Sequence, residues 1–124
     1  MKKYSQISVG ELLDKISILK IKSEKLSDAE KLKHVNHELY VLSKETYDIP
    51  NSEPWIQKLV EVNSKLWDIE DRIREKERDN QFDDEFIQVA RSVYFTNDKR
   101  FEVKNEINTF YNSDVKEQKG YEEY

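Results

Sequence analysis

The sequence predicts an all-α fold, an antiparallel helical bundle of four or five helices with one long central helix. Residues that break helices are rare, since the 124 residues include only two glycines and two prolines. All-β folds and doubly wound α/β folds need many more turns and glycine-rich loops. Residues that can cap helices also precede stretches whose apolar side chains recur at helical spacing. We therefore expect residues 1–111 to form a single helical domain, followed by a C-terminal tail over residues 112–124.

The first helix is expected over about residues 9–26. Ser8 and Glu11 have the spacing of a capping box, in which each side chain binds the other residue's backbone amide. The apolar side chains that follow cover a wide arc, so the helix should be buried on more than one side. Four charged residues are assigned to the solvent-facing stripe of this helix: Glu11, Asp14, Lys15 and Lys22. Of these, Lys15 lies at the border of the apolar arc.

The second helix is expected over about residues 28–46, in a tight hairpin with the first. Ser27 and Glu30 repeat the spacing of a capping box, and apolar side chains then follow helical spacing. His34 and His37 are spaced so that both could face one metal ion, but no third ligand has a recognisable spacing. We interpret both histidines as exposed helix residues and predict no metal site.

The third helix is expected to run unbroken over residues 53–78, after a loop that contains Pro50 and Pro54. Its 26 residues predict a rod on the order of 40 Å long. One apolar seam has coiled-coil spacing: Trp55, Leu59, Val62, Leu66, Ile69 and Ile73. A second stripe, on the first half, exceeds what two short neighbouring helices can cover. We therefore expect a homodimer or higher oligomer with an interface at Trp55, Ile56 and Val60.

The fourth helix is expected to begin near Glu85, with Asp83 or Asp84 as its cap. The apolar pattern allows either one helix to about Tyr111 or a break at Thr96. Continuity is favoured because no glycine or proline intervenes. In the tail, Tyr121 and Tyr124 are candidates for docking it on the helices.

Composition excludes several classes of protein. A net charge of −5 argues against a nucleic-acid binder that relies on a broad basic face. The absence of cysteine excludes disulfide scaffolds, cysteine-based zinc sites and thiol nucleophiles. No apolar run is long enough for a membrane span, and none has the pattern of a secretory signal. No phosphate-binding glycine loop or catalytic triad is recognisable. We expect a cytoplasmic protein with no cofactor.

The one pattern that suggests a binding site is the distribution of arginine. All five arginines lie between positions 72 and 100, and arginine recognises planar anions through paired hydrogen bonds. If the third and fourth helices form a hairpin, a pocket between them could hold a phosphate or a carboxylate. The alternative is a solvated helix end, in which Glu70 and Arg74 form an i,i+4 ion pair. The candidate ligand-binding residues are Glu70, Arg74, Arg91, Asn97, Arg100 and Lys104.

Two segments resemble a small family of bacterial and phage proteins of unknown function. They are residues 9–16, with the sequence V-G-E-L-L-D-K-I, and residues 66–74, with the sequence L-W-D-I-E-D-R-I-R. The resemblance implies a complete stand-alone protein, and bacterial members are sometimes encoded near genes for surface-polysaccharide synthesis. It implies no catalytic residues. Two functions are therefore weighed: a non-enzymatic adaptor or scaffold that contacts proteins as an oligomer, and a binding protein or enzyme for a small anionic ligand such as a nucleotide or nucleotide sugar.

Overall fold

The computed structural model describes all 124 residues and contains four α-helices, one short 3-10 helix and no strand. The helices are α1 (Val9–Lys25), α2 (Ala29–Ser43), α3 (Glu53–Arg78) and α4 (Asp84–Phe110), and the 3-10 helix η1 is Lys44–Thr46. The predicted all-α fold is confirmed. Both α3 and α4 are continuous, so the residues around Thr96 do not break the fourth helix.

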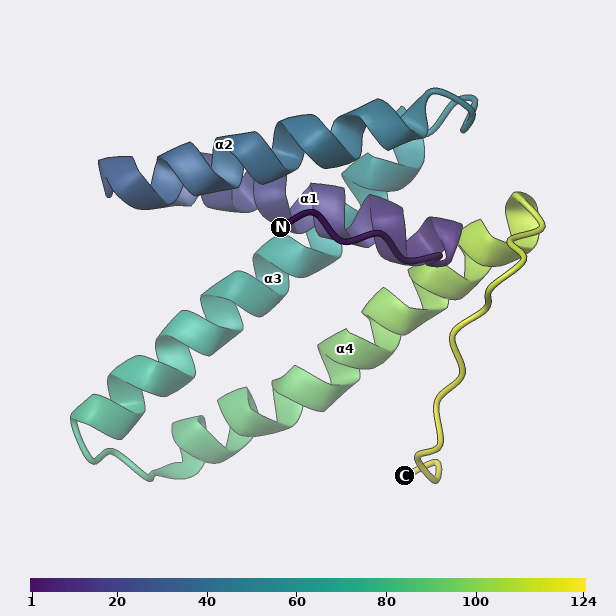
Figure 1. Cartoon of the computed structure of the whole chain (residues 1–124). Helices are drawn as coiled ribbons and strands as arrows, with labels where there is room; N and C mark the ends of the chain where they lie inside the picture. Colours follow the sequence, from purple (N-terminus) through teal and green to yellow (C-terminus); the bar gives the residue numbers. More distant parts are fainter.

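The four helices form two antiparallel hairpins (Figure 1). Helices α1 and α2 make the first, and α3 and α4 make the second. Helix α1 packs against all three other helices, whereas α2 packs on α1 and the following turn. The far ends of α3 and α4 extend beyond the first hairpin as a two-helix arm (Figure 1). The shape is therefore a compact head from which an arm projects.

The hydrophobic core lies where α1 crosses the beginning of α3 and the end of α4. Three of its side chains come from α1, three from α3 and one from α4: Leu12, Leu13, Ile16, Ile56, Leu59, Val62 and Ile107. The wide apolar arc of α1 is thus explained, because neighbouring helices cover it on several sides. In α3, every buried residue except Lys76 lies between Ile56 and Leu66, so the arm has little apolar core. None of the helices carries a stretch of side chains long and apolar enough to cross a lipid bilayer.

Two helix starts follow the sequence prediction. The Ser8 hydroxyl accepts a hydrogen bond from the backbone amide of Glu11 at 3.1 Å, and the Asp83 carboxylate accepts one from the amide of Phe86 at 2.9 Å. Each bond satisfies an amide that has no partner within the helix. The other half of the predicted capping box is wrong, because the Glu11 carboxylate binds lysine side chains instead of reaching back to Ser8.

The starts of α2 and α3 differ from the prediction in detail. Asp28, not Ser27, caps α2, and its carboxylate accepts a hydrogen bond from the amide of Lys31 at 2.9 Å. Aspartate and serine serve equally well as caps, so residue type alone does not distinguish these two neighbours. Ser52 precedes α3 but makes no capping bond with its side chain, because its backbone is already helical. Pro54 lies in the first turn of α3, where its missing N–H costs nothing.

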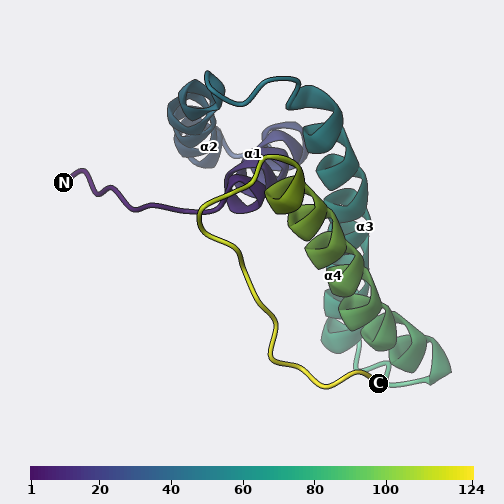
Figure 2. The ribbon, with the colours of Figure 1, turned by 90° about the vertical axis from the view of Figure 1, so that its right-hand side faces the viewer.

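The C-terminal tail does not leave the molecule. Residues 112–124 have no helix, and they run back beside α4 toward its N-terminal half (Figure 2). Of the two tyrosines predicted to dock the tail, Tyr124 packs against aromatic rings of α4, while Tyr121 makes no ring contact with α4 and is 84% exposed.

Candidate functional site

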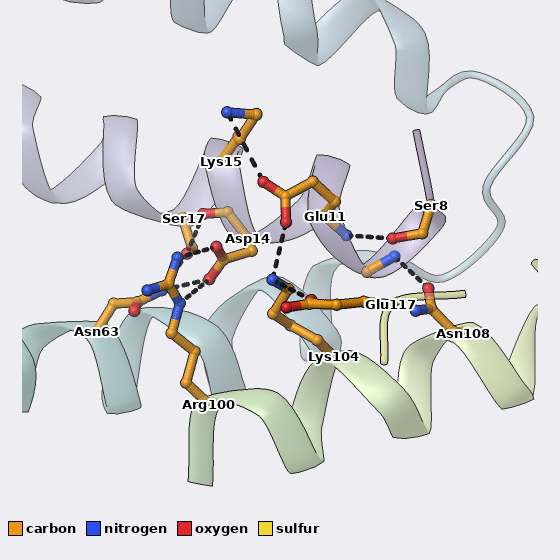
Figure 3. Close-up of polar contacts among 11 residues, drawn as sticks. Ser8, Glu11, Asp14, Lys15, Ser17, Asn63, Arg100, Lys104, Asn108 and Glu117 are labelled. Atoms are coloured by element: carbon orange, nitrogen blue, oxygen red, sulfur yellow. Dashed lines mark hydrogen bonds and ion pairs between the residues drawn. The ribbon is translucent and has the colours of Figure 1, made fainter. Parts of the chain in front are cut away.

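A polar cluster joins α1 to the two helices of the arm (Figure 3). Asp14 lies at its centre, and its exposed fraction is 0%. The Arg100 guanidinium donates to both carboxylate oxygens of Asp14, at 3.0 and 2.5 Å. The Asn63 amide donates to Asp14 Oδ1 and to Ser17 Oγ, each at 2.9 Å. Three helices are thus locked together by one buried carboxylate whose acceptors are used within the chain.

A second ion cluster lies one turn away, around Lys104. This lysine is buried, and its Nζ lies 2.8 Å from a carboxylate oxygen of Glu11 and 2.6 Å from one of Glu117. Burial alone would lower the pKa of Lys104, but the contacts with the two carboxylates outweigh it and raise the pKa. The hydrogen bonds with Asp14 likewise raise the pKa of Arg100. Both cations therefore stay charged, and both are already paired with carboxylates.

The first turn of α1 lies directly against the last turns of α4. The amide of Gly10 donates to Asn108 Oδ1 at 2.7 Å, and the amide of Val9 donates to Ser113 Oγ at 3.1 Å. Both acceptors are buried. A Cβ atom at Gly10 would lie 2.6 Å from the carbonyl oxygen of Lys104, closer than van der Waals contact allows. The sequence needs glycine here so that the two backbones can approach.

The tip of the arm holds a third ion cluster, which the sequence analysis did not predict. Lys76 is only 1% exposed, and its Nζ lies 3.0 Å from Asp83 and 3.3 Å from Glu85. The Arg72 guanidinium also donates to Glu85, at 2.9 Å. Burial alone would lower the pKa of Lys76, but hydrogen bonds to Asp83 and Glu85 raise it. These carboxylates in turn have lowered pKa values: a backbone hydrogen bond from Phe86 acts first on Asp83, and the hydrogen bond from Arg72 acts first on Glu85.

We expect the arm tip to lose stability in acid. The ordinary pKa values of Asp83 and Glu85 are 3.8 and 4.5, and both are lower in the folded chain. The ionised carboxylates therefore stabilise the fold above pH 4.5, and this contribution is lost as the pH falls through the lowered values. Between pH 7 and pH 2, the melting temperature of the variant Asp83→Asn/Glu85→Gln should therefore fall by less than that of the wild type.

The matched control for this titration replaces two exposed carboxylates that make no ion pair, in the variant Glu24→Gln/Glu45→Gln. Its melting temperature should follow the wild type across the whole pH range. Parallel curves for the wild type and for Asp83→Asn/Glu85→Gln would show that the arm-tip ion pairs do not contribute to acid stability.

The structure divides the six candidate ligand-binding residues between two grooves. One groove of ≈ 460 Å³ between α1, α3 and α4, beside Trp67, is lined by four of them: Glu70, Arg74, Asn97 and Arg100. A second groove lies between α4 and the tail, and it is lined by Arg91, Asn97, Arg100 and Lys104. Glu70 and Arg74 form the ion pair expected of a solvated helix end, at 3.4 Å. Arg91 lines the second groove and not the one that contains Glu70 and Arg74, so the six residues do not form a single pocket.

The assignment of Asp14 to a solvent-facing stripe is wrong, because Arg100 supplies a partner that is 86 positions away in the chain. Lys15, in contrast, is exposed and pairs with Glu11 at 3.7 Å. A signal for the buried stripe is present in the sequence: small or short polar residues recur at helical spacing in α1. These residues are Gly10, Asp14 and Ser17, all buried, and the buried Ile21 continues the same stripe.

The three candidate interface residues have different environments. Ile56 is buried in the core of the single chain, so it is not available at the surface. Trp55 and Val60 are half-buried and pack against the same core. The Trp55 ring also contacts that of Phe110, with 5.5 Å between the ring centroids, and Phe110 is 65% exposed. An interface in this region would thus depend on Trp55 and Phe110.

The two histidines lie on the exposed side of α2. His34 approaches the Glu30 carboxylate at 3.3 Å, in an i,i+4 pair, and His37 is also exposed. No group of three or more histidine, aspartate or glutamate side chains is arranged to hold a metal ion.

Comparison with known proteins places the chain in a family. No curated protein and no solved structure matches the chain. The model of one family, described as a family of unknown function (DUF6165), matches residues 1–124. The match covers both segments whose sequence resembles a family of unknown function, residues 9–16 and 66–74. The chain therefore belongs to DUF6165, a family of unknown function.

Proposed function

We propose that this protein is a non-enzymatic helical adaptor or scaffold, which acts as an oligomer in the cytoplasm of a bacterium or a phage-infected cell. One observation carries the proposal: its buried ionised side chains are paired with each other, while its large aromatic side chains remain at the surface. Arg100 is bound by Asp14, and Lys104 by Glu11 and Glu117. Ion pairs of this kind fix the relative positions of helices, as in a rigid platform for protein contacts.

The same pairing argues against catalysis by these residues. A catalytic acid, base or nucleophile needs a pKa matched to its task and a free position toward the substrate. The pKa values of Arg100 and Lys104 are raised by their carboxylate partners, so that both are poor proton donors at neutral pH. Asp14 has no exposed surface through which to meet a substrate.

The proposed contact with a second copy is the aromatic patch of Trp55 and Phe110. Aromatic side chains are enriched at the centres of protein interfaces. The patch lies where α3 begins and α4 ends, and Tyr111 extends it, with 4.9 Å between its ring centroid and that of Phe110. A second copy would cover the exposed Phe110 ring and the free edge of Trp55. The small size of the core, seven side chains, is a further reason to expect a partner, because small domains gain stability by burying surface in oligomers.

Light scattering coupled to size-exclusion chromatography tests this proposal. We expect the wild type to elute as a dimer or larger oligomer at micromolar concentration. Phe110→Ala should shift the oligomer to a monomer, because it removes an exposed ring from the interface and leaves the core intact. Tyr40→Ala is the matched control, since it removes a similarly exposed ring from α2 and should leave the mass unchanged. A monomeric wild type would contradict the oligomeric adaptor.

A second candidate is a protein that binds a small anionic ligand, such as a nucleotide or nucleotide sugar. The groove beside Trp67 supports it, because Arg74, Asn97 and Arg100 line this groove together with an aromatic ring. Carboxylates in the same groove, Glu70 among them, oppose an anion. A ligand at about 100 times its Kd would add roughly 2.7 kcal/mol to stability. A rise in melting temperature with such metabolites would replace the adaptor proposal with this one.

A further inference from the structure

The C-terminal segment is seated on the outer face of α4 through three polar contacts. Glu117 pairs with Lys104 at 2.6 Å, Lys119 pairs with Asp98 at 3.4 Å, and the Tyr124 hydroxyl donates to Asp98. That hydrogen bond raises the pKa of Tyr124 to about 12 and lowers the pKa of Asp98. The charges of the segment thus complement those of the helix face. The basic Lys104 of α4 binds an acidic residue, and the acidic Asp98 binds a lysine and a tyrosine hydroxyl.

Aromatic contacts also hold the C-terminal segment against α4. The Tyr124 ring packs edge-on against Tyr94 and Phe95, with 5.3 and 4.9 Å between ring centroids. The Lys119 ammonium lies 5.2 Å from the centroid of the Phe101 ring. We call this surface the tail site and define it by five residues of α4: Tyr94, Phe95, Asp98, Phe101 and Lys104.

The segment is nevertheless held loosely. No backbone hydrogen bond with another backbone group involves residues 114–124, so side chains alone fix the segment. Tyr124 remains 73% exposed, and a groove of ≈ 1400 Å³ separates much of the segment from α4. Figure 2 shows the tail bowing away from the helix and returning to it near the C-terminus. Segments with few buried contacts open at low free-energy cost.

The apolar surface also continues where the segment ends. Ile87 lies two turns before Tyr94 on the same stripe of α4 and is 51% exposed. Beyond it, at the arm tip, Phe82 is exposed as well. Residues 114–124 leave both of these side chains largely exposed. A longer segment that follows the same path would bury this additional surface.

We propose that the tail site binds an extended segment of a partner protein, and that the chain's own tail competes for the same site. The partner segment carries an acidic residue, a lysine two positions later and a tyrosine five positions after that, as Glu117, Lys119 and Tyr124 do, followed by apolar residues that reach Ile87. This inference rests on the proposed adaptor function, for which it names the kind of partner. A tethered tail acts at an effective concentration on the order of millimolar, so the partner must bind more tightly than the tail does.

Fluorescence anisotropy with a labelled peptide tests the competition. The peptide has the sequence of residues 114–124, and it is titrated with the full-length chain. We expect weak binding to the wild type and at least tenfold tighter binding to Lys119→Ala/Tyr124→Ala, because those changes weaken only the tethered competitor. Adding Asp98→Asn to that variant should abolish the gain, since Asp98 receives both side chains. Tyr4→Ala is the control, because it removes an exposed ring from the N-terminal residues and should leave the affinity unchanged.

A second peptide, extended at its C-terminus by two leucines, tests the path beyond Tyr124. It should bind several-fold more tightly than the first peptide, and Ile87→Asp should remove that difference without changing the affinity of the shorter peptide. Equal affinity of the short peptide for the wild type and the tail-weakened variant would overturn the proposal, as would binding that ignores Asp98. In that case a dimer seen by light scattering would still support the adaptor, whereas stabilisation by nucleotides would reject the adaptor itself.

Discussion

Replacing Asp14 with alanine should lower the free energy of unfolding by about 3 kcal/mol, because the change breaks a buried ion pair and leaves its partner unpaired. The Arg100 guanidinium would lose both carboxylate oxygens, and Asn63 would keep only its bond to Ser17. Urea denaturation followed by circular dichroism measures the effect as a lower midpoint. A loss that large would unfold an appreciable part of a small domain at physiological temperature.

The matched control is Glu53→Ala, which breaks an exposed ion pair with Lys20 at 3.4 Å. It should cost less than about 1 kcal/mol, as surface ion pairs do. Arg100→Met should also destabilise, because it strands the buried carboxylate, and the double variant Asp14→Ala/Arg100→Met should lose less than the sum of the single losses. If Asp14→Ala costs no more than Glu53→Ala, the buried carboxylate does not lock α1 to the arm.

Local signals in the sequence were sufficient for the helices themselves. The caps Ser8 and Asp83 and the scarcity of glycine and proline predicted the starts of α1 and α4 and the continuity of α4. Caps and helix breakers act on residues within about one helical turn, so their effect can be predicted from the local sequence alone. The helical spacing of the apolar residues in α3 also predicted an unbroken helix over residues 53–78, as found.

The polar clusters were only half predicted, because their partners lie far apart in the chain. Arg100 and Lys104 were predicted as ligand-binding residues, but the carboxylates on α1 that pair with them are 86 and 93 positions away. Periodicity assigns a charged residue to the solvent unless a partner is known, and it therefore misplaced Asp14. Lys76 was missed for a related reason: its burial depends on how the turn at the arm tip brings Asp83 and Glu85 over it.

The second large effect is expected at Gly10, where alanine should destabilise the fold by about 2 kcal/mol through overpacking. The new Cβ atom would lie 2.6 Å from the Lys104 carbonyl oxygen and 2.9 Å from Asn108 Oδ1. The first of these is a backbone atom inside a helix, so relief requires α1 and α4 to move apart. That movement would also stretch the 2.7 Å hydrogen bond from the Gly10 amide to Asn108.

The sign of this change is what makes it informative. In a helix that has room for the methyl group, glycine to alanine raises stability by roughly 0.5–1 kcal/mol, because alanine restricts the unfolded chain. Gly120→Ala is the control, since no atom lies within 4 Å of the added Cβ in the tail, and it should leave the unfolding midpoint unchanged. A gain in stability for Gly10→Ala in urea denaturation would show that α1 and α4 do not meet backbone to backbone. The positions of Asp14 against Arg100 and of Glu11 against Lys104 would then lose their structural basis, because both pairs lie on the same crossing of the two helices.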